Sequence, residues 1–411
     1  MAYATTQSQN LTNFDEALKV DYLPVIREQL NNARILSNKI ERNERDVSGK
    51  QWQMTTHVGR SSGIGSGTES GLPTASNQEY LNPYGNVKFT RGRISLSGPV
   101  IAASRSDTGA MARALESEIK GITEDMKKEV NYQFFNDGSA VRALVNGDPG
   151  TEVTLTLDSP GTRWLQEGIL IDFFDPAAGT TRTPTVGTHI ESISSATAAK
   201  TNVANVSGVA DNDWVIRKGA RAGATNLLTD SYEMMGLKGI IDDGAYVTTL
   251  HNLSRTTYPH WNCSTNSTDS NGGTLRDLST DLIQASLTSV EANGGKTNLI
   301  ISDHALRDAY AALIVADKRF VNTMKLDGGF TALEYNGIAW VADGDCPANT
   351  IFFVDTDHLQ IMQMSDWSWM DRDGAVLSRV ADADAYEAVL YWYADLTTDK
   401  PKAHAFLRDV Q

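Results

Sequence analysis

The sequence of 411 residues has few of the features that would place it in a membrane, a secretory pathway or a disulfide-stabilised fold. Its two cysteines, Cys263 and Cys346, cannot form a disulfide framework, and they suit a reducing compartment. One of the longest apolar runs, residues 309–316, has eight residues, whereas a membrane-spanning helix needs about 20. The first ten residues, MAYATTQSQN, have neither a basic start nor an apolar stretch, which predicts that they are not a secretory signal.

Basic residues are also fewer than acidic ones: the sequence has 36 Lys and Arg and 51 Asp and Glu, which gives a net charge of −15. Proteins that grip nucleic acid neutralise phosphates with Lys and Arg, so this balance argues against such a role. It suits a protein that stays soluble at high concentration, or one that lies beside a polyanion without adhering to it. The composition, 40% hydrophobic and 21% charged, is that of a globular protein, and the length predicts two or three domains.

Motifs for catalysis, cofactors and metals are weak or missing. Residues 59–63, GRSSG, match the nucleophile pattern of serine hydrolases around Ser61, but glycine-rich sequence follows instead of the helix that this pattern requires. Residues 63–67, GIGSG, lack the strand and helix of a dinucleotide site, and no phosphate-binding loop ends in Gly-Lys-Ser/Thr. The seven histidines are scattered, without the spacing of a metal site. The sequence therefore predicts that the protein is not an enzyme and uses no cofactor or metal.

A glycine- and serine-rich stretch between two segments of strand formers predicts a long hairpin with a mobile tip. The two segments are residues 51–58 and 87–96, and the 13 residues from Gly59 to Gly71 include five glycines and four serines. An isolated hairpin is marginally stable in water, so this one needs a surface to lie on. We expect that surface to belong to another subunit.

The clearest helix is predicted over residues 107–136. Its apolar residues, from Met111 to Phe134, recur every three or four positions, and Asn136-Asp137-Gly138 ends it. At about 1.5 Å per residue the helix is roughly 40 Å long, more than a small core needs, so we interpret it as a spine. Arginines cluster nearby in this acidic sequence, either as ordinary surface residues or as partners for acidic groups of a neighbouring subunit.

The remaining regions have distinct patterns. Residues 1–50 are polar, with a helical stripe within residues 14–40, which predicts either an N-terminal helix packed on the body or an arm that docks on a neighbouring chain. Residues 146–226 hold short strand candidates separated by turn residues, which predicts an inserted small β-barrel or sandwich. Residues 227–349 contain a predicted helix at 275–290, a buried strand at 298–302 and a second helix from Asp303 to about Asp317, an α/β layer. Residues 350–411 are mainly strands, and the very apolar strand at 387–395 is predicted to be covered on both faces.

The order of these elements resembles the major capsid proteins of tailed bacteriophages, with the Hong Kong 97-type shell fold. The run that carries the resemblance is KFTRGRISLSGPVIAASRSDTGAMARALESEIKGITEDMKKEVNYQFFNDGS, residues 88–139, where an extended loop leads through a short linker into a long spine helix. The final strands, AVLYWYAD and AHAFLRD, are similar to the closing strands of that family. The resemblance covers residues 50–140 well and 275–411 loosely.

The resemblance implies an α+β fold with six parts. These are an N-terminal arm (1–50), an extended loop formed by the hairpin (51–101), a peripheral domain with the spine helix (102–145), an inserted β domain (146–226), an axial domain (227–349), and closing strands of the peripheral and axial domains (350–411). Intersubunit contacts are assigned to Trp52, Phe89, Arg91, Arg93 and Arg105.

The function implied is that of a structural protein that self-assembles into pentamers and hexamers of an icosahedral phage head enclosing double-stranded DNA. Its partners would be other copies of itself, with scaffolding, portal and decoration proteins as further candidates and no membrane. The DNA would be enclosed without sequence-specific binding, and the protein would be part of the virion, assembled in the host bacterial cytoplasm. A scaffolding coiled coil is not evident in the N-terminal sequence, and a Lys–Asn cross-link, which some members form, cannot be placed.

Three alternatives stay open at this stage. The same fold also serves encapsulin-like cellular shells, which would enclose cargo enzymes. A serine hydrolase would use Ser61 with a distant His and Asp. A phage tail or adhesion protein, suggested by the β-rich middle of the sequence, would form trimers or tubes.

Overall fold

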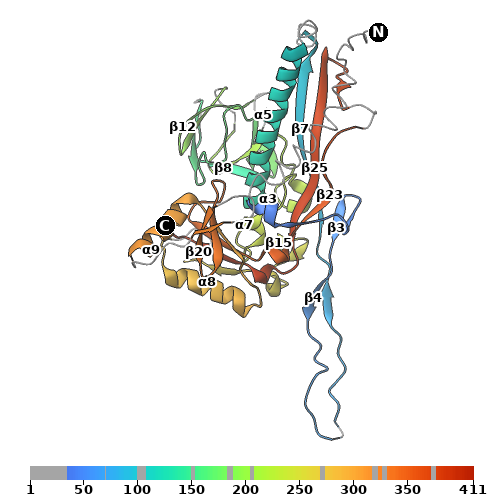
Figure 1. The fold of residues 1–411 in the computed structure, drawn as a ribbon, viewed down its shortest axis with the longest axis vertical. Coiled ribbons are helices and arrows are strands. Elements are labelled where there is room, and N and C mark those ends of the chain that lie inside the picture. The colour runs from blue at the N-terminus through green and yellow to red at the C-terminus, as the bar shows by residue number, and fades with distance from the viewer. Residues whose placement is uncertain are drawn as a thin grey trace, which may run out of the picture. The chain divides into compact units, whose positions relative to one another are not determined.

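The structure is a computed structural model, and it describes residues 35–69, 71–99, 108–149, 153–182, 188–203, 208–268, 274–316, 323–325, 331–371 and 376–411 (Figure 1). The chain forms two compact units. Unit 1 contains Met1–Lys39, Lys88–Asn131 and Gln363–Ala394, and unit 2 contains Ile40–Val87, Tyr132–Met362 and Asp395–Gln411. Most of the predicted helical stripe at 14–40 lies outside the described residues, and its described end is α3 (Ile35–Lys39).

Unit 1 is built on a sheet covered by the long helix α5 (Thr108–Phe135), which confirms the predicted spine helix. In this sheet β7 (Lys88–Ser97) pairs antiparallel with β25 (Ala385–Thr398), so that Lys88 lies opposite Ala394 and Ser97 opposite Ala385. Unit 1 also holds β24 (Ser378–Arg379) and the part of β23 (Leu359–Trp369) from Gln363 onward. The earlier part of β23 belongs to unit 2, where it pairs with β1 (Glu41–Asn43). Side chains alternate along β7, so Ile94 and Leu96 are buried whereas Phe89 and Arg91 are exposed.

Two predictions about these strands are wrong. Residues 87–96 do not pair with residues 51–58, because β7 pairs with β25 over its whole length. Local alternation marks a strand but does not identify its partner, which explains the error. The strand at 387–395 is not covered on both faces, because its side chains alternate between buried and half-buried as far as Tyr393.

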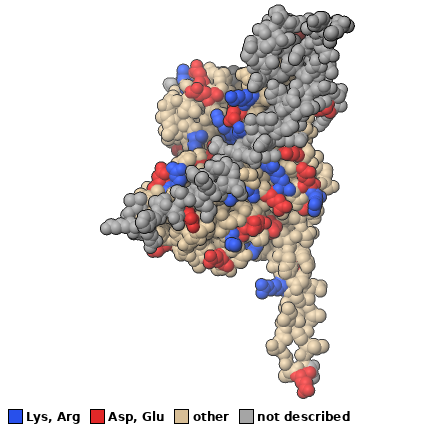
Figure 2. All heavy atoms as spheres, in the orientation of Figure 1, with Lys and Arg blue, Asp and Glu red and all other residues tan. Residues whose placement is uncertain are grey.

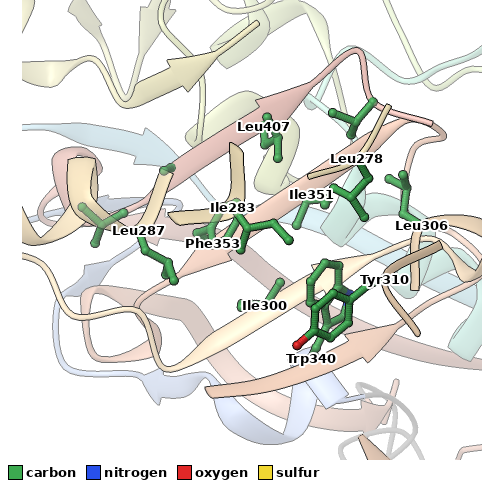
Figure 3. Close-up of a cluster of buried hydrophobic side chains, with 13 residues drawn as sticks. Leu278, Ile283, Leu287, Ile300, Leu306, Tyr310, Trp340, Ile351, Phe353 and Leu407 are labelled. Atoms are coloured by element: carbon green, nitrogen blue, oxygen red, sulfur yellow. The ribbon is translucent and has the colours of Figure 1, made fainter. Parts of the chain in front are cut away.

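One of the two seven-stranded sheets described in unit 2 has the order β17-β26-β22-β18-β21-β20-β19. Its strands are β17 (Ser264–Asn266), β18 (Leu299–Ser302), β19 (Thr323–Lys325), β20 (Thr331–Tyr335), β21 (Ile338–Ala342), β22 (Thr350–Val354) and β26 (Ala405–Arg408). Helices α8 (Thr280–Ala292) and α9 (His304–Ala316) pack on it through the apolar cluster of Figure 3, in which the rings of Tyr310 and Trp340 stack 4.3 Å apart.

Both helices begin at a polar cap. The Ser279 hydroxyl accepts a hydrogen bond from the Leu282 N–H at 3.3 Å, and the Asp303 carboxylate accepts one from the Leu306 N–H at 3.0 Å. Asn293 caps the end of α8, and Gly294 follows with a φ of +72°. The predicted helices are therefore confirmed, with α8 starting at Thr280 rather than at residue 275.

The inserted module is a closed barrel in its described part. Its strands follow the order β11-β10-β14-β8-β9-β13-β12. They are β8 (Val141–Val145), β9 (Thr154–Asp158), β10 (Ile171–Asp175), β11 (Thr180–Arg182), β12 (Ile190–Ser195), β13 (Ala198–Thr201) and β14 (Trp214–Arg217). The sheet closes because Leu170 bridges His189 and the Ile171 N–H donates to the Thr188 carbonyl at 3.0 Å. The predicted boundary at residue 146 is too late, because β8 belongs to this sheet.

Short elements complete unit 2. They are β2 (Val47–Ser48), β3 (Gln51–Gln53), β4 (Thr56–Gly59), β5 (Glu79–Leu81), β6 (Tyr84–Asn86), α6 (Leu227–Asp230), α7 (Leu237–Ile240), β15 (Thr249–Leu250), β16 (Leu253–Ser254) and the 3₁₀ turns Pro259–Trp261, Thr356–His358 and Pro401–Ala403. Strand β3 pairs with β6 and β4 with β5, so the true hairpin joins residues 51–59 to residues 79–86.

Candidate subunit-contact surfaces

The hairpin of unit 2 is a two-stranded ribbon held by polar side chains. Beyond β4 and β5, the hydroxyl of Ser61 donates to the Ser76 carbonyl at 2.7 Å. Within β4, His57 Nε2 lies 2.6 Å from the amide oxygen of Gln78, the residue before β5. Nearer the base, Thr55 and Asn82 are joined at 3.0 Å. These contacts all join the two legs of the ribbon, which Figure 1 draws as a long loop beyond β4 and β5.

Two large apolar side chains lie exposed at the far end of this ribbon. Ile64 is 87% exposed and Leu72 is 95% exposed. Within residues 54–82 the charged residues are Arg60, Glu69 and Glu79, and the ribbon is mostly uncharged in Figure 2. Contiguous exposed apolar patches mark interaction sites, so these two side chains at one end of the ribbon are candidates for such a site. The sequence held this signal, as two apolar residues in a stretch of Gly, Ser and Thr, but the predicted contacts did not include them.

The base of the ribbon is fixed by a group that we call the hairpin anchor, formed by Trp52, Gly85, His251 and Asp395. The Trp52 indole is fully buried, and its Nε1–H donates to the Asp395 carboxylate at 3.1 Å. The His251 ring meets the indole edge-on at 4.8 Å, and a Cβ on Gly85 would lie only 2.5 Å from Trp52 Cζ2. Trp52 was assigned to an intersubunit contact, but its burial within its own chain leaves no surface for a neighbour.

A second surface lies on unit 1, on the face of β7 and β25 that points away from α5. We call it the aromatic face. The Phe89 and Tyr393 rings meet edge-on at 4.8 Å, and Tyr391 stacks on Tyr393 at 4.7 Å. The Arg91 guanidinium lies over both the Phe89 ring, at 5.4 Å, and the Tyr393 ring, at 5.7 Å. Sequence reasoning found Phe89 and Arg91 but missed the two tyrosines, which the register brings opposite them.

The two other predicted contact residues lie differently. Arg93 is exposed beside the aromatic face, where it forms an ion pair with Glu387 of the neighbouring strand. This pairing occupies the guanidinium within its own chain. Arg105 lies outside the described residues. The structure thus brings Phe89, Arg91 and Arg93 together on one face and places Trp52 elsewhere.

The described residues do not assemble a hydrolase site around Ser61. Strand β4 ends at Gly59 and no helix follows, so the strand-to-helix turn that presents such a nucleophile is not formed. Within the same residues, no group of three or more His, Cys, Asp or Glu side chains is placed to hold a metal ion. No described helix is long and apolar enough to cross a membrane.

Three buried titratable groups, His404, Cys263 and Cys346, have polar partners within the chain. His404 Nδ1 accepts from the Asp355 N–H at 3.2 Å and Nε2 lies 3.3 Å from the Thr398 hydroxyl, and burial lowers the pKa of His404 to about 3. Burial raises the pKa of the Cys263 thiol to about 12, and Cys346 is buried with a raised pKa as well. Both thiols are therefore protonated at neutral pH and unreactive.

Comparison with known proteins agrees with this architecture. The family model for the SU10 major capsid protein matches residues 209–411. The capsid asymmetric unit of cyanophage A-1(L) has the same fold, with a TM-score of 0.54 and 15% identity over 91% of this chain and 90% of that chain. Two looser matches follow. An encapsulin complex from Synechococcus elongatus PCC 7942 has a TM-score of 0.45 and 9% identity over 100% of this chain and 93% of that chain. The satellite phage P4 procapsid has a TM-score of 0.43 and 10% identity over 97% of each chain. No curated protein matches the chain.

Proposed function

We propose that this chain, which is a tailed-phage major capsid protein with the Hong Kong 97-like fold, joins neighbouring copies of itself through the tip of its hairpin. Its role as a structural protein of the phage head rests on the family match over residues 209–411 and on the fold. The observation that carries the proposal is the exposure of Ile64 and Leu72 at the end of the ribbon. These side chains have no cover in their own chain among the described residues.

The contact we infer is apolar at its centre. Burying an aliphatic side chain such as Ile or Leu contributes about 1.5–3 kcal/mol, so the two residues together can supply much of a weak intersubunit contact. Copies of a chain with a net charge of −15 repel one another. A ribbon with few charges is the part of such a chain that approaches a neighbour at least electrostatic cost.

Weak contacts of this kind suit a closed shell, because head-to-tail interfaces that close by rotation form rings. We propose pentamers and hexamers as these rings, arranged as an icosahedral head around double-stranded DNA. The acidic chain would line that space without binding the DNA tightly. Scaffolding, portal and decoration proteins are proposed as further partners, and the host cytoplasm as the place of assembly.

The test is assembly of a tip variant. The double substitution Ile64→Ser with Leu72→Ser should leave the unfolding transition of the unassembled chain within about 0.5 kcal/mol, because exposed side chains contribute little to folding. The same variant should form few or no shells by negative-stain electron microscopy at concentrations where the unchanged protein assembles. The matched control is Thr74→Ser with Asn77→Ser, two exposed polar positions on the same ribbon, which should assemble normally.

Normal shells from the Ile64/Leu72 variant would contradict the tip contact while leaving the capsid role intact. A cellular encapsulating shell is the second candidate, since its fold is the same. Particle contents separate the two, because a phage head should contain double-stranded DNA and a cellular shell should contain protein cargo.

The aromatic face is proposed as a second contact surface. Arg91 has no acidic partner among the described residues, whereas Arg93 is paired with Glu387 in its own chain. Arg91 is therefore the arginine available to meet a carboxylate of a neighbouring copy, with two parallel hydrogen bonds. Arg91→Ala should then reduce shell yield more than Arg93→Ala, and equal yields would contradict this assignment.

A further inference from the structure

The base of the hairpin rests on a turn that contains a buried histidine. Strands β15 and β16 are joined by His251 and Asn252, with φ values of +50° and +64°. Two left-handed residues are what a tight two-residue β-hairpin turn requires, and His and Asn tolerate this region better than most side chains. The carbonyl of His251 accepts a hydrogen bond from the Tyr84 N–H of β6 at 3.2 Å. The turn therefore supports the hairpin through its main chain as well as through the ring contact with Trp52.

The surroundings of the His251 ring suit a neutral imidazole. Its Nε2 atom is buried and has no hydrogen-bond partner among the described residues. The positive charge of the buried Arg255 guanidinium disfavours a proton on this ring, and the guanidinium is fixed because it donates to the Gly239 and Ile240 carbonyls at 2.9 and 2.8 Å.

The acidic groups near this site are already engaged. Asp242 lies 3.6 Å from Arg255 and accepts from the Tyr246 and Val247 amides. Asp395 accepts from Trp52 and from the Met235 N–H. From β6, Tyr84 contributes its backbone N–H. A proton on His251 would therefore place a second cation beside Arg255 without an acceptor, which is costly in a buried site.

We propose that His251 makes the hairpin anchor acid-sensitive: the neutral ring holds Trp52 and the base of the hairpin, and protonation drives the ring out and frees the base. The acid response itself is a property of the single chain. Only its consequence rests on the proposed function: acid would loosen the segment that reaches a neighbouring copy. Loss of shell assembly and loss of this response are thus separate outcomes.

The expected change in how often the anchor opens follows from the linkage between protonation and opening. Burial, followed by the charge of Arg255, lowers the pKa of His251 from 6.5 to about 3 in the closed anchor. If the released ring regains its ordinary pKa, opening becomes about 30-fold more frequent between pH 7.5 and pH 5, because the open form binds the proton and the closed form does not.

The experiment is hydrogen exchange on the full chain, kept unassembled, at pH 7.5 and 5.0. The reporters are the amides of Gln53, Met54 and Tyr84, which donate to the Asp46, Pro83 and His251 carbonyls. After correction for the intrinsic pH dependence of exchange, their protection should fall about 30-fold at pH 5 in the unchanged protein. In His251→Asn, which keeps a residue suited to the left-handed turn, protection should be the same at both pH values.

The matched control is His404→Asn. His404 is also buried with a pKa of about 3, but it bonds Asp355 and Thr398 rather than the hairpin. This variant should keep the full pH response of the three amides. If His251→Asn does not fold, His251→Gln replaces it in the same comparison. Unchanged protection in the wild-type chain, or the same loss in a folded His251 variant, would overturn the proposal.

Discussion

Gly92 is a residue at which the spine helix closely approaches the sheet of unit 1. A Cβ at this position would lie 2.7 Å from Cδ1 of Ile122 and 3.2 Å from Sδ of Met126. We therefore expect Gly92→Ala to lower the free energy of unfolding by about 1–3 kcal/mol, because the helix must shift or its side chains must leave their rotamers. Urea unfolding of the unassembled chain measures this.

Gly121→Ala is the control for that substitution. Gly121 lies in the spine helix α5 itself, and nothing lies within 4 Å of a Cβ added there. It should leave stability unchanged or raise it by up to about 1 kcal/mol, because alanine favours the helix. Equal effects of the two substitutions would show that α5 does not pack closely on β7.

His404 gives the stability of the chain a definite pH dependence. Its pKa is about 3 in the folded chain and 6.5 when exposed, so the unfolded chain takes up the proton first as the pH falls. The free energy of unfolding should therefore decrease from about pH 6.5 down toward pH 3. His404→Asn should be less stable at pH 7, because two hydrogen bonds are lost, yet show a shallower decrease in acid. A decrease as steep as that of the unchanged protein would contradict this contribution.

At the scale of elements, the helices and the hairpin differ in how far the sequence reveals them. Helices α5, α8 and α9 were predictable because their apolar spacing is a local signal, to which α9 adds the cap at Asp303. The cap at Ser279 was missed, and α8 was therefore predicted to start too early. The pairing of β7 with β25 was not, because the partners are nearly 300 residues apart and either strand alone fits many sheets.

The residues of the contact surfaces were likewise predictable where the signal is local and not where it depends on long-range strand pairing. Arg91 and Phe89 were found as residues of one strand, whereas Tyr391 and Tyr393 became part of that face only through strand register. Trp52 was singled out for its size, but size alone does not distinguish an exposed anchor for a partner from a buried anchor for its own hairpin. His251 was missed because an isolated histidine in a turn has no sequence signal until its neighbours are known.

The hairpin anchor makes a prediction about one element. Asp395→Asn keeps the size of the side chain but removes the charge that accepts from the Trp52 indole and the Met235 amide. Hydrogen bonds to a charged group contribute about 1.5–3 kcal/mol, so stability should fall by that order. Proteolysis should then cleave residues 51–59 faster than in the unchanged chain. Stability and cleavage equal to those of the unchanged chain would contradict the role of this contact.

At the scale of the whole molecule, charge opposes assembly and apolar contact favours it. With −15 on each chain, screening by salt should raise the yield of shells, since the Debye length falls from about 10 Å at 0.1 M to about 3 Å at 1 M. Light scattering across this range measures the yield. A yield that falls with salt would instead show that ion pairs, such as those available to Arg91, dominate the contact.

The most direct test of the central claim is a cryo-electron microscopy reconstruction of particles assembled from the purified chain. The account predicts closed shells in which the ribbon of residues 54–82 crosses to a second copy and buries Ile64 and Leu72 there. Shells in which the two side chains stay in solvent, or a chain that stays monomeric while its ribbon folds onto its own unit, would contradict it.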